Sequence, residues 1–476
     1  MGDALPAQPR PVKLVQFGDG VFLRGFIDWM VQRMNDLAGF NGGVCVIKAV
    51  AGSFDPAWSL QDRCFTVSRL GIERGKIAQL RERISVVERL VNPHDDFGAF
   101  LREADNADLV CVVSNVPESS FIYSENDRSA GKPAEAYPGK LTQFLRRRFE
   151  SFSGDADKGL LILPCELIEA NATILRSLVL AYAARWYDDP DFEAWITLYC
   201  RFLDTLVDCI VIGAEESDKA DWHSESGLRD ELMVNCEFNH QLTIMGNSGL
   251  ERILPFAAAG LNVVWVDDLG LARLLKTRIL NTSHIFLTLC GIPMGLGNVL
   301  DCMDHPVLRP AMDQLLAEEI IPFLEIDEDT LDFYHDSVRW RLSNPVINHR
   351  LSTLAQFAIN KWKTRSLPAL LEMVERSGSL PKMLCFSLAA LIFRYTSGEA
   401  VQDEPRSVAF FSSLSRLVQN DTLNAMWSIV HDRSLWGESL STLRGLEEMV
   451  GQQLSQILQL GMSEALRQLL NENPIS

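Results

Sequence analysis

One apolar segment carries three polar side chains that could do carbonyl chemistry. The segment 273–290, RLLKTRILNTSHIFLTLC, is predicted to be a helix because its apolar residues recur at helical spacing. At about 100° per residue, with Lys276 at 0°, Asn281 is at about 140° and His284 at about 80°. One broad face therefore presents an amine, an amide and an imidazole. Carbonyl reduction needs such groups, as a proton donor, a donor to the oxyanion and a group that fixes a substrate hydroxyl.

The lysine of this segment is expected to have an altered pKa. Burial among Leu and Ile should lower the pKa of Lys276, and more so with Arg273 and Arg278 nearby. Lys276 could then act as a base near neutral pH. The alternative is an ordinary polar stripe on an amphipathic helix, and the segment alone leaves both interpretations open.

Strand-like and helix-like stretches alternate through the first half of the chain. Strands are predicted at 13–18, 42–50, 84–91, 106–115 and 158–166, and helices at 22–36 and 138–149. Alternation of this kind is typical of parallel βαβ units. The polar segment 124–139 is predicted to be an exposed loop.

A glycine pair stands between the first strand and the first helix, in VQFGDGVFLRGF. Gly18 and Gly20 are small where a dinucleotide fold needs a sharp turn and close approach of the backbone to a pyrophosphate. The third glycine, Gly25, comes two positions later than in GxGxxG, so a plain glycine turn is the alternative. Lys48 follows the second strand where an acidic residue would favour NAD, and the motif leaves NAD and NADP both open.

The second half differs because strand signals nearly vanish from about Pro255 onward. Helices are predicted at 273–290, 310–325, 352–362, 382–396 and 439–461. A chain of 476 residues is too long for one ordinary core. We therefore expect an α/β, Rossmann-type domain over 1–254 and a mostly α-helical substrate-binding and catalytic domain over 255–476.

Composition excludes several classes of protein. The net charge of −19 disfavours a nucleic-acid-binding groove. No run of about eighteen apolar residues exists, and the opening residues lack the apolar core of a signal peptide. The ten cysteines form no CxxC pair, which favours buried free thiols over a zinc site or a disulfide framework. We expect a soluble, cytoplasmic protein without a nucleic-acid or membrane partner.

The spacing Lys-x4-Asn-x2-His resembles the active-site motif of the polyol-specific long-chain dehydrogenase/reductase family, which includes mannitol dehydrogenases and hexuronate reductases. The similarity extends over nearly the whole chain and is greatest to the hexuronate reductases. It rests on VQFGDGVFLRGFIDWM, VVSNVPES, YPGKLTQFLRRRF, KGLLILPCELIEANA, LPFAAAGLNVVWVDDL, EEIIPFLE and NPVINHRL. The resemblance implies NAD as cofactor, no metal, and hydride transfer to a ketose or keto-sugar acid.

The resemblance assigns roles position by position. Lys276 matches the general acid/base, Asn281 an oxyanion-hole amide, and His284 a substrate-orienting residue. Asn171 matches the second amide of the oxyanion hole, although by itself it would more simply be a helix N-cap or loop residue. The family's nucleotide-binding segments fall on Gly18, Gly20, Phe22, Arg24, Ser114, Asn115 and Glu118. Glu118 could equally be a helix-start residue.

The segment 202–218 departs from the family pattern. Asp208 is kept, and we expect it near the substrate, but Cys209 stands where the family has an arginine and Ala214 where it has a tyrosine. Asp204 adds a negative charge where the family is neutral. Loss of the arginine removes either a substrate contact or a salt bridge to Asp208.

A second cationic segment, 344–368, also resembles the hexuronate reductases. It contributes His349, Lys361, Lys363 and Arg365. Cations on a helix are ordinarily solvated charges. We expect His349 and Lys363 to lie near the substrate.

The resemblance implies an NAD-dependent oxidoreductase that interconverts a keto-sugar acid and its alcohol, with D-tagaturonate and D-altronate as the expected pair. The alternative within the family is a polyol dehydrogenase for mannitol, arabinitol or a related uncharged sugar alcohol. The alternative from another class is a non-catalytic sugar or nucleotide sensor. Intact Lys276, Asn281 and His284 argue against a sensor, which has no need of a proton donor.

Overall fold

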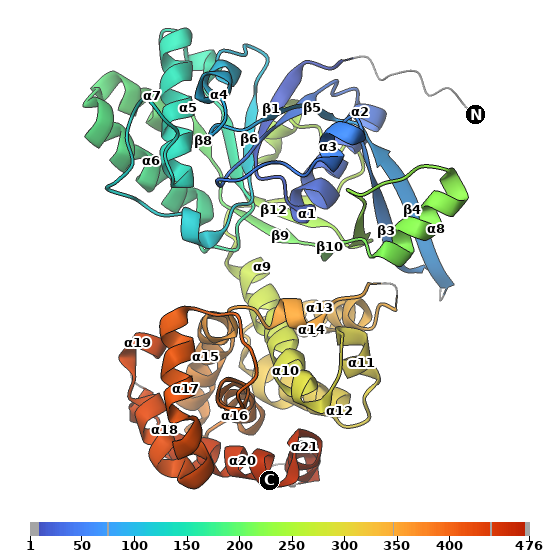
Figure 1. Ribbon diagram of the computed structural model, residues 1–476, viewed down its shortest axis with the longest axis vertical. Coiled ribbons are helices and arrows are strands. Elements are labelled where there is room, and N and C mark those ends of the chain that lie inside the picture. Colours follow the sequence, from blue (N-terminus) through green and yellow to red (C-terminus); the bar gives the residue numbers. More distant parts are fainter. Residues whose placement is uncertain (1–8, 74–75, 346, 438–439, 472–476) are drawn as a thin grey trace. The chain divides into compact units, whose positions relative to one another are not determined.

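The computed structural model describes residues 9–471 apart from 74–75, 346 and 438–439 (Figure 1). Its contacts divide the chain into two compact units, Met1–Ala272 and Arg273–Ser476. The predicted boundary between residues 254 and 255 precedes this division, and the last strand of the first unit lies between the two positions.

A six-stranded parallel sheet forms the centre of the first unit. Its spatial order is β5-β2-β1-β6-β7-β8, and every neighbouring pair is parallel. The strands are β1 (Val12–Phe17), β2 (Gly43–Ile47), β5 (Val87–Val91), β6 (Cys111–Ser114), β7 (Leu161–Pro164) and β8 (Arg201–Phe202). Numbered within the sheet alone, this is the order 3-2-1-4-5-6 of a doubly wound dinucleotide-binding domain. The predicted α/β, Rossmann-type fold is confirmed.

Alternate residues of each central strand enter two different cores. Leu14 and Val44 pack on one face with the helical segment α1 (Val21–Leu23), η1 (Arg24–Asp28) and α2 (Trp29–Ala38). Val15 and Phe17 pack on the other face. There they meet α4 (Phe97–Glu103), α5 (Tyr137–Ser151), α6 (Asn171–Tyr187) and α7 (Pro190–Tyr199), which lie together on one side of the sheet in Figure 1. Burial on both faces explains why these strands are almost wholly apolar.

Two smaller sheets were not predicted. A four-stranded sheet contains β3 (Phe65–Glu73), β4 (Lys76–Ile84), β10 (Val211–Gly213) and β11 (Val234–Glu237), and a three-stranded sheet contains β9 (Thr205–Asp208), β12 (Gln241–Met245) and β13 (Val263–Val266). Short helices α3 (Ala57–Leu60) and α8 (Glu216–Ser226) complete the unit. The expectation that strands end near Pro255 is wrong for β13, an edge strand with no fully buried residue and hence a weak signal.

The second unit is helical in every element described, as predicted. Its helices are α9 (Gly270–Leu275, entering from the first unit), α10 (Thr282–Gly291), α11 (Val299–Asp304), α12 (Leu308–Gln314), α13 (Glu328–Leu342), α14 (Leu351–Leu354), α15 (Ala358–Ser377), α16 (Lys382–Thr396), α17 (Pro405–Asn420), α18 (Thr422–Val430), α19 (Arg433–Trp436), α20 (Leu446–Leu460) and α21 (Met462–Asn471). Every residue of α10 is buried, so this helix lies at the centre of its core.

Three predicted segments differ in the structure. The helix expected at 352–362 is broken at Phe357, whose φ of 54° separates α14 from α15. The segment 124–139 is not wholly exposed, because Asp127 is buried and accepts hydrogen bonds from the backbone of Glu135 and Ala136. Residue 439 of the helix expected at 439–461 lies outside the described residues, and α20 begins at Leu446.

Candidate active site

The predicted catalytic helix contains a π-helical turn. Lys276–Asn281 forms this segment, called the π turn below, between α9 and α10. The Thr282 hydroxyl also bridges five residues, donating to the carbonyl of Thr277 at 3.1 Å. Closure over five residues places Asn281 one turn beyond Lys276, whereas α-helical spacing puts the two about 140° apart. The π turn thus brings the amine and the amide onto one face.

The side chains of this face are sheltered from solvent. Lys276 is 8% exposed. Asn281 is half-buried, and its amide has no hydrogen-bond partner among the described residues. Because this amide has no such hydrogen bond to break, it can donate one to a substrate oxygen at little cost in free energy. The predicted shift in the pKa of Lys276 stays a prediction.

Two buried histidines lie together beyond the π turn. The rings of His284, on α10, and His349, just before α14, have centroids 4.9 Å apart at an interplanar angle of 77°. His284 Nε2 and His349 Nδ1 are buried, and neither has a hydrogen-bond partner among the residues that the structure describes. Burial, with the charge of Lys361, lowers the pKa of His349 to about 4. Burial also lowers the pKa of His284 well below its ordinary value. Both rings are therefore neutral near pH 7 and can bind a substrate hydroxyl as donor or acceptor.

Several cations surround this pair. His349 and the charges of Arg341, Arg365 and Lys276 add to burial in lowering the pKa of His284. Arg341 lies in the last turn of α13 and was not predicted as a site residue. Lys361 and Arg365 lie four residues apart on α15 and so share a face. The signal for this pair was present in the sequence as i, i+4 spacing.

Lys363 lies elsewhere on α15. Lys363 follows Lys361 by two residues, so the two side chains lie about 200° apart around the helix axis. Its Nζ lies beside Gly437, 3.5 Å from where a Cβ on that glycine would be. Of the cations of this segment, Lys361 and Arg365 act on the histidines. The substrate contact expected of Lys363 stays a prediction.

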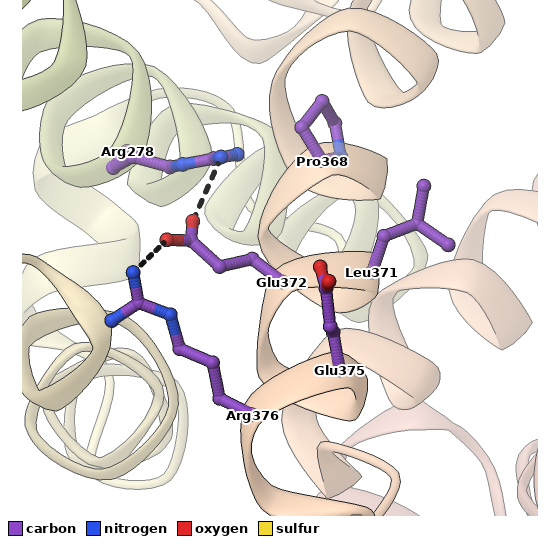
Figure 2. Close-up of a pocket in the computed structure, with 6 residues that line it drawn as sticks. All are labelled: Arg278, Pro368, Leu371, Glu372, Glu375 and Arg376. Carbon is purple, nitrogen blue, oxygen red and sulfur yellow. Dashed lines mark hydrogen bonds and ion pairs between the residues drawn. The ribbon is translucent and has the colours of Figure 1, made fainter.

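The π turn is also joined to α15 by an ion pair. Arg278 pairs with Glu372 on α15, with 3.1 Å between Nη2 and Oε2, and Arg376 approaches the other oxygen of Glu372 at 3.2 Å. Figure 2 shows both guanidinium groups directed at this carboxylate, in a hollow of about 560 Å³ lined by Arg278, Pro368, Leu371, Glu372, Glu375 and Arg376. Arg278 was expected to act on Lys276. The structure instead couples its charge to Glu372 and fastens the π turn to α15.

In the first unit, the turn after β1 fits a dinucleotide. Gly18 has φ of 120°, and a Cβ there would lie 2.8 Å from the carbonyl oxygen of Asn115, so only glycine fits. A Cβ on Gly20 would meet nothing within 4 Å, which leaves the outer side of the turn open to a pyrophosphate. Gly25 lies inside the helical segment, where a Cβ would lie 2.5 Å from Val211. The displaced third glycine thus permits close packing on the four-stranded sheet.

The other predicted nucleotide-binding residues have defined surroundings. Phe22 stacks on Phe26, with 5.1 Å between ring centroids, and Arg24 donates to the backbone carbonyl of Asp19 at 2.9 Å. Asn115 donates to the carbonyl of Cys165 at 2.9 Å. Glu118 is exposed and begins a short 3-10 helix, Glu118–Ser120.

Ser114 is engaged by a buried carboxylate that was not predicted. Its hydroxyl donates to Glu166 at 3.1 Å, and the backbone N–H of Val116 donates to the other carboxylate oxygen at 3.0 Å. Burial raises the pKa of Glu166 to about 7, although these hydrogen bonds oppose the shift. Glu166 therefore ties the loop after β6 to the loop after β7.

Asn171 is buried and makes several hydrogen bonds. Its Nδ2 lies 3.0 Å from the carbonyl of Pro164 and 3.1 Å from that of Glu166, and its Oδ1 accepts from the N–H of Thr205 at 3.1 Å. These bonds tie the start of α6 to the end of β7 and the start of β9. Its oxyanion role stays a prediction, and in this arrangement its amide binds the protein itself.

The segment after β8, which departs from the family pattern, contains two buried aspartates. Asp204 is buried and accepts from the N–H groups of Ala172 and Thr173 at 2.7 and 3.0 Å, so its added charge caps the start of α6. Asp208 is buried at the end of β9, where its carbonyl accepts from Asn239 at 3.2 Å. Cys209 is half-buried.

The described residues contain neither a metal-binding cluster nor a membrane-spanning helix. Among them, no group of three or more His, Cys, Asp or Glu residues is placed to bind a metal ion. None of the described helices combines the length and apolarity needed to cross a membrane. All ten cysteines are free thiols.

The order of the sheet, the glycine turn and the lysine-bearing helix define a Rossmann-type dehydrogenase with a helical second domain. Residues 12–252 match the model of the mannitol dehydrogenase Rossmann domain, and residues 273–458 match that of the mannitol dehydrogenase C-terminal domain. The chain belongs to the mannitol dehydrogenase family and is an oxidoreductase acting on CH–OH groups.

Relatives cover nearly the whole chain. The altronate oxidoreductase of Bacillus subtilis (strain 168) is 36% identical over 458 residues, which are 96% of this chain and 95% of that protein. The altronate oxidoreductase of Klebsiella pneumoniae (strain 342) is 35% identical over 473 residues, 98% of each chain.

Solved structures share the fold at lower identity. Pseudomonas fluorescens mannitol 2-dehydrogenase, in a ternary complex with NAD and D-mannitol, has a TM-score of 0.79 at 19% identity, over 98% of this chain and 96% of that one. Substrate-free D-sorbitol dehydrogenase has a TM-score of 0.75 at 21% identity, over 96% and 95%.

Proposed function

We propose that this protein is an NAD-dependent, cytoplasmic oxidoreductase that interconverts D-tagaturonate and D-altronate. The observation that carries the reaction type is the π turn, which sets the Lys276 amine and the Asn281 amide on one face beside two neutral histidines. The relatives named altronate oxidoreductase support the substrate, and the glycine turn supports the cofactor.

Residues of the second unit have separate roles in the proposed reaction. When bound, the nicotinamide supplies the hydride to the keto carbon. As charge develops on the ketone oxygen, the Asn281 amide donates a hydrogen bond to it, and protonated Lys276 delivers the proton that completes the alcohol. In the oxidising direction neutral Lys276 removes that proton. His284 and His349 orient a neighbouring hydroxyl.

The charges around the histidines favour an anionic substrate. Arg341, Lys361 and Arg365, besides Lys276, act on this histidine pair. A guanidinium binds a carboxylate through two parallel hydrogen bonds. An uncharged polyol has no carboxylate and cannot form this charged pair. We therefore place the uronate carboxylate toward Arg341 and Arg365.

One feature of the first unit favours a neutral polyol as the second candidate substrate. Cys209 stands beside Asp208 where the hexuronate reductases of the family have an arginine, and one of the two roles open to that arginine is a substrate contact. A polyol dehydrogenase for mannitol or arabinitol would not need it.

An assay of NADH absorbance against matched substrates tests both candidates. Tagaturonate, fructuronate and fructose should be compared for kcat/KM in reduction, with altronate, mannitol and arabinitol in oxidation. We expect the highest value for tagaturonate and altronate. A higher kcat/KM for fructose, mannitol or arabinitol would overturn the uronate assignment, and no turnover with any of them would overturn the enzymatic proposal.

A further inference from the structure

The end of β2 lacks the acidic residue that dinucleotide folds use to recognise adenosine. In such folds a carboxylate here accepts hydrogen bonds from the ribose hydroxyls and repels the 2′-phosphate of NADP. Here Lys48 follows Ile47, the last residue of β2. A lysine in this place would by itself attract a 2′-phosphate.

The glycine turn supplies a carboxylate to the same place. Asp19, between Gly18 and Gly20, has its Oδ2 2.7 Å from Lys48 Nζ. The pairing of β1 with β2 explains the approach, because Phe17 is opposite Ile47 and the N–H of Gly18 donates to the carbonyl of Ile47 at 3.0 Å. The residues that follow the two strands therefore meet at the same edge of the sheet.

The geometry leaves one oxygen of the carboxylate available. Asp19 Oδ1 has no hydrogen-bond partner among the described residues, and the side chain is 24% exposed. Lys48 is more enclosed, at 13%, and its Nζ also lies 5.3 Å from the centre of the Phe54 ring. The lysine is thus held between a carboxylate and an aromatic face, while the carboxylate remains open on one side.

We propose that Asp19 recognises the adenosine ribose and excludes the 2′-phosphate, and that its ion pair withholds Lys48 from that phosphate. The proposal rests on the nicotinamide cofactor of the proposed function. Oδ1 accepts from a ribose hydroxyl of NAD. A 2′-phosphate in that position meets the negative charge of Asp19 and must separate Lys48 from it. The acid that discriminates between the cofactors therefore comes from the glycine turn and not from the end of β2.

A purely structural role for the ion pair predicts a different result. If Asp19 only braces the turn, its removal disturbs the pyrophosphate site that both cofactors share. NADH and NADPH would then lose affinity by the same factor. The ratio of the two dissociation constants separates the roles, whatever the absolute loss.

The test is a fluorescence titration of NADH and NADPH, without sugar substrate. The variants are Asp19→Asn, Asp19→Ser and Asp19→Asn combined with Lys48→Ala. Glu216→Gln is the matched control, because Glu216 also pairs with a lysine, Lys219, at 2.8 Å, but on α8. Circular dichroism establishes that each variant is folded.

We expect wild-type protein to bind NADH more tightly than NADPH. Either Asp19 variant should weaken NADH binding by about tenfold, the value of a charge-assisted hydrogen bond, and tighten NADPH binding through the released Lys48. The added Lys48→Ala change should abolish the gain for NADPH, and Glu216→Gln should leave the ratio unchanged.

An unchanged NADH to NADPH ratio in both Asp19 variants would overturn this inference and leave the proposed function intact. Wild-type protein that binds neither cofactor, or that prefers NADPH, would contradict the proposed NAD dependence and this inference with it.

Discussion

Arg278, within the π turn, and Glu372, on α15, form an ion pair with 3.1 Å between Nη2 and Oε2. The side chains are 11% and 27% exposed. The pair links the backbone that carries Lys276 and Asn281 to the helix that carries Lys361 and Arg365. Glu372 is therefore expected to position the catalytic turn without touching substrate.

Removing that carboxylate should damage catalysis more than cofactor binding. Glu372→Gln leaves Arg278 without its ion pair, so we expect a loss of about 1–3 kcal/mol in unfolding free energy and a fall in kcat. The dissociation constant of NADH should not change. Glu375→Gln is the matched control, because Glu375 lines the same hollow and forms no ion pair among the described residues (Figure 2). Equal kcat values for the two variants would show that Glu372 does not position the turn.

Lys276 is the residue on which the proposed reaction depends. Lys276→Ala should lower turnover by roughly two to four orders of magnitude, the usual contribution of general acid–base catalysis. NADH affinity should be nearly unchanged. Wild-type alcohol oxidation should rise with one ionisation below the free-lysine value of about 10.4, and that ionisation should be absent from the variant. Near-normal turnover with the same pH profile would make Lys276 an ordinary helix lysine.

Local patterns predicted most of the fold and part of the site. The buried strands and the position of Lys276 and His284 follow from periodicity within single segments, which a sequence displays directly. The π turn could not be predicted, because a helical wheel assumes α spacing throughout. In an α-helix, Asn281 would lie about 140° around the axis from Lys276. In the π turn it lies one turn beyond Lys276, on the same face.

Contacts between distant segments account for what was missed. Asn171 is linked to Thr205, and Ser114 to Glu166, by pairings that no local pattern indicates. The acid at the end of β2 was missed because strand pairing brings Asp19 there. Lys361 and Arg365 could have been chosen over Lys363, since their i, i+4 spacing puts them on one helix face.

The two asparagines assigned to the oxyanion hole should behave differently when truncated. Asn281→Ala removes an amide that has no hydrogen-bond partner among the described residues, so it should cost on the order of 3 kcal/mol in the chemical step and little in stability. Asn171→Ala breaks bonds to Pro164, Glu166 and Thr205 and should lower the unfolding free energy by about 1–3 kcal/mol. Thermal unfolding and single-turnover kinetics separate the two effects. A stable Asn171→Ala protein with a large loss in the chemical step would instead support the oxyanion role predicted for Asn171.

Asp28 should make the stability of the first unit depend on pH. It is fully buried at the end of η1, and neither carboxylate oxygen has a hydrogen-bond partner within the described part of the chain. Burial raises its pKa from 3.8 to about 8, although Gln16 and Arg24 act in the opposite direction. Gln16 Oε1 is also buried and has no partner among the described residues, which suits a protonated Asp28 as donor.

The direction of the pH effect follows from these pKa values. Between about pH 4 and pH 8 the folded protein keeps a proton on Asp28 that the unfolded chain releases, so the free energy of unfolding falls as the pH rises through this window. Asp28→Asn cannot ionise and should lose this component. Urea denaturation gives the free energy of unfolding of each protein. The value for the variant minus the value for wild type should therefore rise by a few kcal/mol between pH 5 and pH 8, which is the order of magnitude that linkage gives. Buried Glu166 and Glu319 titrate in both proteins and cancel in the difference. A difference that stays constant with pH would mean that Asp28 is already ionised in the folded protein at pH 5.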